Sequence, residues 1–126
     1  MTVKTLSKDD IIGLHKELIN IYGGTHGVRD DALFDSAIAA PFQSFGGVDF
    51  YPSIEEKAAR LGYGLAANHP FHDGNKRIGA HAMLVFLDIN GITLNCSPSE
   101  LSDIFLSIAS GNTEESDLLD WIISHK

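Results

Sequence analysis

The chain has 126 residues, of which 44% are hydrophobic and 21% charged, and 9 Lys and Arg against 17 Asp and Glu give a formal net charge of -8. This length suits one domain, which can bury roughly two-thirds of its unfolded surface, so we expect residues 1–126 to form a single domain. The acidity argues against binding of nucleic acid or an anionic membrane by the whole surface.

Cysteine content and apolar runs limit the protein class further. The single cysteine, Cys96, cannot form an internal disulfide, which fits the reducing cytoplasm, where we expect the protein. The longest apolar run, residues 82–87, is too short to span a bilayer, and residues 1–10 contain no apolar core of a signal peptide. A disulfide scaffold, a membrane protein and a disordered tail are therefore excluded, and we expect no direct nucleic-acid or membrane partner.

Helix signals dominate the first part of the chain. Ser7 begins a capping-box pattern, and apolar residues then recur at helical spacing until Gly23. Asp30 can cap a second helix, which must end near Pro41. Residues 43–52 are rich in turn formers and indicate a loop or a short hairpin.

The middle of the chain predicts a central helix. Ser53 and Glu56 form a second capping box, which opens a helix that ends at about Asn68. After an interruption, residues 75–90 carry apolar side chains almost all the way round the helical wheel. We therefore expect this fourth helix to be central and buried.

Two more helices follow. Ser97 opens a third capping box with Pro98 at the first helical position, and this helix breaks at Gly111. A last helix carries the apolar residues of 118–122, and residues 92–94 suit a short extended piece. Six helices with short connections predict an all-α fold, a compact six-helix domain.

The segment from His69 to Arg77, His-Pro-Phe-His-Asp-Gly-Asn-Lys-Arg, is the most informative part of the sequence. Pro70 disfavours the α conformation for the residue before it, so the preceding helix must stop there. Lys76 and Arg77 then lie in the first turn of the central helix, whose amino end carries about half a positive charge. Each cation there costs on the order of 0.3–1 kcal/mol, unless an anion binds between them.

Phosphate is the anion that suits this segment. Free backbone N–H groups of Gly74, Asn75 and Lys76 would point at it, and the Gly74 backbone would allow a close approach. Lys76 would add a point charge and Arg77 a planar fork of donors.

Two neighbouring side chains suggest chemistry at that phosphate. Asp73 beside a polyphosphate is a candidate Mg²⁺ ligand, because Mg²⁺ prefers one or two carboxylates together with phosphate oxygens. His69 lies one loop away and can serve as a general base near neutral pH. The segment therefore indicates phosphoryl or nucleotidyl transfer.

The residues alone leave plainer interpretations open. Lys and Arg in one helix turn are usually solvated, Asp-Gly-Asn is a common turn, and a histidine before proline is most often structural. Phe71 suits a buried anchor of the loop, and His72 suits a solvent-facing position. A metal-dependent phosphohydrolase that uses the His72-Asp73 pair, and a catalytically silent binding module, are the two other classes.

The same segment resembles the motif of the Fic/Doc family, and Lys76 resembles its death-on-curing (Doc) toxin branch. Residues 22–24 and 27–30 also look like the amino-terminal part of such toxins, so the resemblance covers nearly the whole chain. It implies that His69 deprotonates a target hydroxyl and that Asp73 holds Mg²⁺. It further implies that Gly74 and Asn75 form the anion hole and that Lys76 and Arg77 hold phosphate.

Two positions differ from the adenylylating Fic enzymes and favour a different reaction from AMP transfer. Those enzymes usually have glycine at the position of Lys76 and an arginine at that of Ala80. The Doc branch instead resembles a protein kinase that binds ATP in the reverse sense and transfers the γ-phosphoryl to a threonine of elongation factor Tu, which stops translation. AMP transfer is the alternative. His81, where Doc-like toxins often carry asparagine, is expected to line the nucleotide site.

The resemblance also implies partners. Residues 45–51 occupy the sequence position of a target-docking flap, and Doc toxins of type II toxin-antitoxin systems are silenced by an antitoxin whose C-terminal helix fills a groove. Some Fic proteins carry an internal inhibitory helix of pattern Ser/Thr-x-x-x-Glu-Gly/Asn. Ser110 to Glu114 begins that way, but Glu115 breaks the pattern, so we expect an ordinary helix entry and inhibition by a separate chain.

Overall fold

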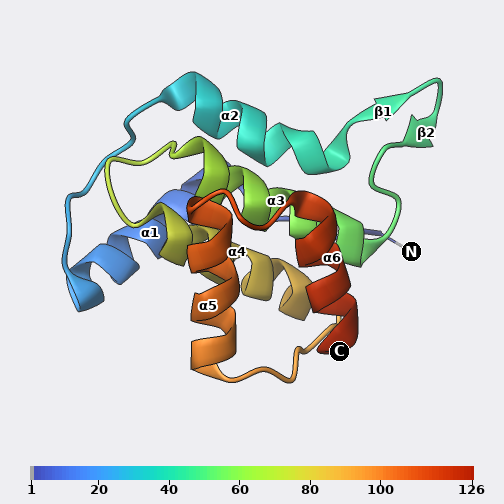
Figure 1. Cartoon of the computed structure of the whole chain (residues 1–126). Coiled ribbons are helices and arrows are strands. Elements are labelled where there is room, and N and C mark those ends of the chain that lie inside the picture. Colours follow the sequence, from blue (N-terminus) through green and yellow to red (C-terminus); the bar gives the residue numbers. More distant parts are fainter. Residues whose placement is uncertain (1) are drawn as a thin grey trace.

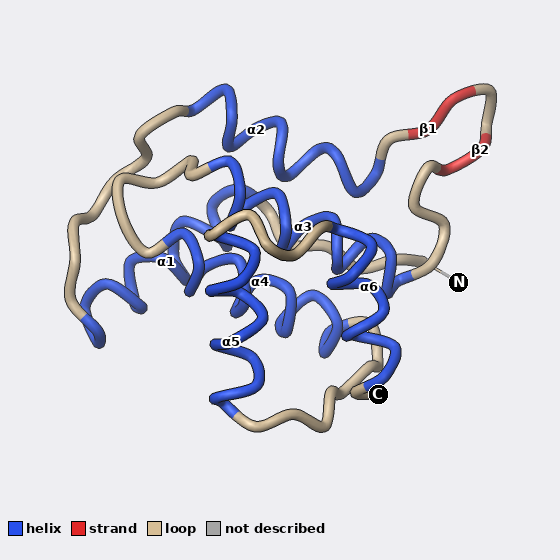
Figure 2. The backbone as a smooth tube through the Cα atoms, in the orientation of Figure 1, coloured by secondary structure: helices blue, strands red, loops and turns tan. Residues whose placement is uncertain are grey.

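Six α-helices, a single turn of 3-10 helix and one small hairpin make up residues 2–126, the part of the chain that the computed structural model describes (Figures 1 and 2). The helices are α1 (Lys8–Tyr22), α2 (Asp31–Ala39), α3 (Ile54–Asn68), α4 (Asn75–Ile89), α5 (Pro98–Ala109) and α6 (Glu115–Ser124). The 3-10 turn η1 is Ala40–Phe42, and the strands are β1 (Ser44–Phe45) and β2 (Val48–Asp49). The all-α prediction is confirmed.

Side-chain caps define most helix starts. The capping boxes predicted at Ser7, Ser53 and Ser97 all form, and Asp30 caps α2 through the Leu33 N–H. An acidic capping box also opens α6 at Glu114, which confirms an ordinary helix entry there. Among the six described α-helices, α4 alone has neither a side-chain cap nor a capping box: it begins after Gly74, whose backbone is left-handed (φ 73°).

The core is centred on the packing of α3 against α4, with α2 above this pair and α1, α5 and α6 around it (Figure 1). The two central helices approach closely where a glycine of each faces the other. A Cβ built on Gly79 would lie 2.8 Å from the Gly62 carbonyl oxygen and 3.1 Å from the Phe105 ring. Ile78, Ala82 and Met83 of α4 are fully buried, so the prediction of a central buried helix is confirmed.

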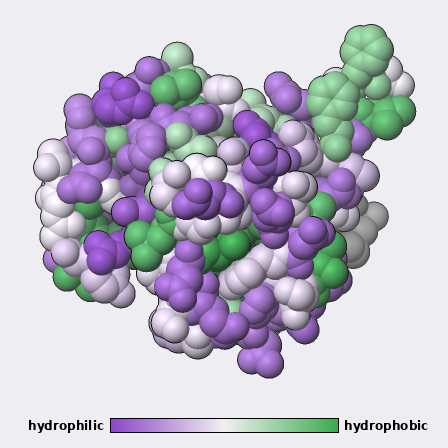
Figure 3. All heavy atoms as spheres, viewed as in Figure 1, coloured by the Kyte–Doolittle hydropathy of each residue, from purple (hydrophilic) through white to green (hydrophobic). Residues whose placement is uncertain are grey.

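The hairpin stands away from the helical body and is apolar on its outside (Figure 3). Its residues Phe45 and Val48 pair in antiparallel register and are 80% and 68% exposed. The buried ammonium of Lys57, near the start of α3, fastens the hairpin base through the Asp49 carboxylate (3.3 Å) and the Tyr51 carbonyl.

The hairpin therefore forms where the sequence predicted a loop or a hairpin, and its role as a docking flap stays a prediction. It lies at the amino end of α3, whereas His69 follows the carboxyl end of this 15-residue helix. A helix of that length spans about 22 Å. The hairpin does not cover the segment from His69 to Arg77 in this arrangement.

Residues 92–94, predicted as a short extended piece, connect α4 to α5 without joining a strand of the described chain. They line one side of a hollow described below. No helix within residues 2–126 is both long enough and apolar enough to cross a membrane.

Candidate active site

His69 caps the carboxyl end of α3 in a left-handed conformation, with φ 51° and ψ 55°. Pro70 disfavours the right-handed α conformation at His69, as expected, but His69 adopts a left-handed conformation rather than an extended one. The Arg29 guanidinium braces this turn, because its Nε donates to the His69 carbonyl (2.8 Å) and its Nη2 to the Asn68 carbonyl (3.2 Å). These are carbonyls that a helix end leaves without partners, and the turn leaves the side chain of His69 exposed.

Phe71 anchors the loop in the core, as predicted. Its side chain is 1% exposed, stacks on the His15 ring of α1 (centroids 3.8 Å apart, planes at 12°) and tilts against Phe34 of α2 (4.9 Å). The buried Asn75 amide accepts from the Phe71 N–H (3.0 Å) and donates to the Phe71 carbonyl (3.1 Å). His72 is exposed, also as predicted.

The segment between α1 and α2 runs antiparallel to this loop. Val28 forms a β-bridge with Phe71, and the N–H groups of Arg29 and Asp30 both donate to the Pro70 carbonyl (2.7 and 3.1 Å). The His72 N–H donates to the Gly27 carbonyl (3.1 Å). Backbone hydrogen bonds to residues 27–30 therefore fix the motif loop along the side that faces this segment.

Asp73 is held at three points. Its carboxylate accepts from the Gly74 N–H (2.8 Å) and the Thr25 N–H (3.2 Å). Its carbonyl lies 2.7 Å from His15 Nε2, which must be the donor because a carbonyl only accepts. Burial lowers the pKa of His15, which favours the neutral ring. Gly24 is needed beside this carboxylate, since a Cβ there would lie 2.7 Å from Asp73 Oδ2.

These contacts correct the expected anion hole. The Gly74 N–H is not free for an anion because the Asp73 carboxylate already accepts from it. The Asn75 side chain points back into the loop and serves the fold. Within residues 2–126 no hydrogen bond is found to the N–H groups of Asn75, Lys76 and Arg77, so these three donors at the start of α4 are available.

The two cations of the first turn are exposed and unpaired. Within the described chain neither Lys76 nor Arg77 forms an ion pair or a side-chain hydrogen bond. The Arg77 guanidinium carbon lies 4.3 Å from the ring centroid of Tyr22, the last residue of α1. Asp73 thus lies just before the free donors of α4, Lys76 and Arg77 belong to the same first turn, and His69 stands at the start of the same loop.

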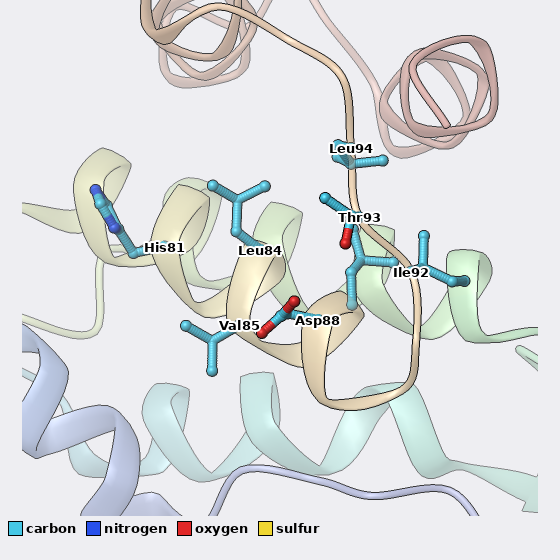
Figure 4. Close-up of a pocket in the computed structure, with 8 residues that line it drawn as sticks. His81, Leu84, Val85, Asp88, Ile92, Thr93 and Leu94 are labelled. Carbon is cyan, nitrogen blue, oxygen red and sulfur yellow. The ribbon is translucent and has the colours of Figure 1, made fainter.

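His81 lies one turn beyond Arg77 and is half-buried. Burial lowers its pKa, and the Arg77 charge lowers it further. It borders a hollow of about 370 Å³ that runs along α4 to residues 92–94. In Figure 4 its side chain and that of Leu84 rise from the same side of α4, whereas Val85 points away. This hollow does not include Lys76 or Arg77, so His81 faces a neighbouring space rather than the phosphate donors themselves.

The site fits a metal ion only in company with phosphate. Asp73 supplies an exposed carboxylate whose oxygens each accept one hydrogen bond and retain further lone pairs. No group of three or more His, Cys, Asp or Glu side chains with metal-binding proximity occurs in residues 2–126. That arrangement suits Mg²⁺ carried by a polyphosphate, and it offers little to the metal-dependent phosphohydrolase, which needs ligands from other helices.

Sequence reasoning missed the residues that support the site from outside the motif. His15, Tyr22, Thr25 and Arg29 all contact the motif segment, 40 or more positions away along the chain. The helical spacing of His15 and Tyr22 places both on one face of α1. The sequence does not show which element packs against that face, because this depends on how the helices are arranged in the fold.

Comparisons with known proteins agree with the motif. The profile described as the Fic/DOC family matches residues 5–87. The chain is 48% identical over 73 residues to "Toxin Doc" of Mycolicibacterium smegmatis, a match that covers 58% of this chain and 56% of that protein, so it spans about half of that relative. It is 30% identical over 118 residues to "Protein kinase doc" of Escherichia phage P1, which covers 94% of this chain and 92% of the phage protein.

Proposed function

Since the chain belongs to the Fic/Doc family, we propose that it is the toxin of a type II toxin-antitoxin system and transfers the γ-phosphoryl of ATP to a protein hydroxyl. The relative that spans nearly the whole chain is named a protein kinase, and the other is named a toxin. The proposed target is a threonine of elongation factor Tu, whose modification would stop translation.

One observation carries this proposal. The central helix begins without a side-chain cap, and the N–H groups of Asn75, Lys76 and Arg77 have no partner within residues 2–126. The positive end of the helix and two unpaired cations together favour a bound polyphosphate. Such preorganised donors stabilise the charge that develops during phosphoryl transfer.

Each side chain of the motif has a role in this scheme. The exposed His69 ring accepts the proton of the attacking hydroxyl. Lys76 and Arg77 neutralise the transferring phosphoryl group, and Arg77 can bind two oxygens at once. Asp73 would hold Mg²⁺ together with the phosphates, and the ion would neutralise part of their negative charge. His81 remains a proposed contact for the nucleotide beyond the phosphates.

Transfer of the γ-phosphoryl is favoured over AMP transfer by two positions. Lys76 places a long cationic side chain where the adenylylating enzymes have open space for the α- and β-phosphates. Ala80, which stands at the position of their second arginine, is 6% exposed and offers no donor to a phosphate. These residues suit a nucleotide that binds with its terminal phosphate at Lys76 and His69, as transfer of the γ-phosphoryl requires.

The partner proposed for inhibition is an antitoxin with an amphipathic C-terminal helix. Residues 110–114 form the turn into α6 and not an internal inhibitory helix, so inhibition would come from a separate chain. A hollow of about 370 Å³ beside α4 and one of about 590 Å³ between α1 and α4 share Val85, and their partly apolar linings would receive such a helix.

Label transfer tests the reaction. Purified protein is incubated with elongation factor Tu, Mg²⁺ and ATP radiolabelled at either the γ- or the α-phosphate. We expect label on the target from the γ position alone. Label from the α position would replace the kinase by AMP transfer, and no transfer from either would remove the enzymatic function.

The matched control is His69→Asn, which suits the site better than His69→Ala. Asparagine tolerates the left-handed backbone of this position, so the fold is kept while the base is lost. Expression of the wild type without an antitoxin should stop bacterial growth, and expression of His69→Asn should not. Normal growth with the wild type at equal protein level would contradict the toxin function.

A further inference from the structure

One face of the carboxyl-terminal half of α1 supports the candidate site. His15, Ile19 and Tyr22 are spaced by four and three residues, so they share one side of the helix. His15 holds the Asp73 carbonyl, and the Ile19 Cδ1 atom would be 3.2 Å from a Cβ on Gly74. Tyr22 lies beneath the Arg77 guanidinium, 4.3 Å from its carbon atom.

The contact between Tyr22 and Arg77 differs in kind from an ion pair. A carboxylate partner would occupy the N–H donors of the guanidinium, whereas an aromatic ring covers only its flat face. No carboxylate of residues 2–126 bonds to Arg77, and both oxygens of Asp73 accept from backbone N–H groups instead. Within residues 2–126 the guanidinium N–H groups of Arg77 thus have no acceptor, while its carbon atom lies over the Tyr22 ring.

Tyr22 has little structural reason to be aromatic. Its side chain is 56% exposed, and it is absent from the buried cluster and from the partly buried residues packed against it. The chain leaves the helix directly after it, at Gly23, whose φ is 86°. The ring thus stands at a free helix end, and Arg77 is the group it covers.

We propose that Tyr22 is a positioning residue that holds the Arg77 guanidinium flat against its ring so that the donor fork faces the polyphosphate of ATP. This rests on the proposed function, and it adds a residue outside the motif to the phosphate site. Without the ring, Arg77 would sample many side-chain conformations, and ATP binding would have to restrict them.

A double-mutant cycle tests the coupling, with the dissociation constant of Mg²⁺-ATP as the measurement. Tyr22→Ala should weaken binding about fivefold, as expected for loss of one exposed cation–π contact. Arg77→Ala should weaken it about tenfold to a hundredfold. In the Arg77→Ala background, Tyr22→Ala should cause no further loss, because the ring acts through the guanidinium.

Two further variants separate positioning from simple folding effects. Tyr22→Phe keeps the ring and should bind Mg²⁺-ATP as the wild type does. Ile21→Ala removes the neighbouring side chain, which is 71% exposed, and should also leave binding unchanged. In NMR spectra the Arg77 side-chain resonances should carry a ring-current shift that persists in Tyr22→Phe and disappears in Tyr22→Ala.

The outcomes distinguish this proposal from the function on which it rests. Equal losses from Tyr22→Ala in both backgrounds, or wild-type binding by Tyr22→Ala, would overturn the role of Tyr22 and leave the kinase intact. The expected cycle without transfer to any protein would support Tyr22 and overturn the kinase. Wild-type protein that binds no Mg²⁺-ATP would overturn both.

Discussion

Asn75 shows how a single residue of the motif serves the fold before it serves chemistry. Its amide makes two hydrogen bonds with the backbone of Phe71, in a position only 8% exposed. These bonds close the loop that presents His69 and Asp73. The residue that begins the central helix therefore also fixes the shape of the segment before it.

Asn75→Ala should lower the free energy of unfolding by about 2 kcal/mol or more, because a buried N–H and a buried carbonyl of Phe71 lose their partners. Urea unfolding measures this. Asn20→Ala, which alters an exposed asparagine of α1, should change stability by less than about 0.5 kcal/mol. Equal stability of the two variants would show that the loop does not depend on this amide.

Local rules of sequence predicted part of the site and missed the rest. They placed Phe71 in the core, His72 in solvent and Lys76 and Arg77 in the first turn of a buried helix. They did not show that Asp73 would accept from the Gly74 N–H, since this depends on a side-chain rotamer. The supporting roles of His15 and Arg29 were not predicted because their partners lie 58 and 40 positions away along the chain.

The position of the motif segment depends on how α3 and α4 cross. Gly62 and Gly79 let the two backbones meet, and the Gly79 hydrogen faces the Gly62 carbonyl. Because Gly79 lies in the same helix as Lys76 and Arg77, a change in this crossing would also move the phosphate donors.

Gly79→Ala should destabilise the protein by about 1–3 kcal/mol, because overpacking against a backbone carbonyl outweighs the better helix propensity of alanine. Gly13→Ala is the matched control: a Cβ there meets nothing within 4 Å, so it should stabilise the protein by about 0.5–1 kcal/mol. Thermal unfolding of both variants measures the difference. A stabilised Gly79→Ala protein would contradict the close approach of α3 and α4.

Helix boundaries at this scale followed from capping chemistry, because each Ser, Asp and Pro acts on residues within one turn. The hairpin was foreseen as a local turn, but its location relative to His69 was not, since that depends on the direction in which α3 crosses the molecule. The start and end of each helix depend on neighbouring residues in the sequence, whereas the arrangement of the helices depends on how they pack.

For the whole molecule, the last helix is fastened to α5 by a pH-sensitive pair. The His125 ring lies 2.6 Å from the Trp121 carbonyl and 3.1 Å from the Glu100 carboxylate. The Trp121 carbonyl and then Glu100 raise the pKa of His125 above its ordinary 6.5. The Ser97 N–H and then His125 lower the pKa of Glu100 below its ordinary 4.5.

The sign of the pH dependence follows from these directions. The His125 contribution to stability is fully present below its unfolded pKa and is lost as pH rises through its raised folded pKa. As the pH rises above 6.5, the melting temperature of the wild type should therefore fall relative to that of His125→Gln, because the contributions of the other histidines are common to both proteins. Identical slopes for the two proteins would show that the pair contributes nothing.

An amide-resolved NMR titration with Mg²⁺-ATP shows whether the amino end of α4 binds polyphosphate. The backbone N–H signals of Asn75, Lys76 and Arg77 should shift most, in proportion to bound nucleotide. They should not move when adenosine is added in the presence of Mg²⁺. Shifts confined to other helices, or equal shifts with adenosine, would contradict a phosphate site at this helix end.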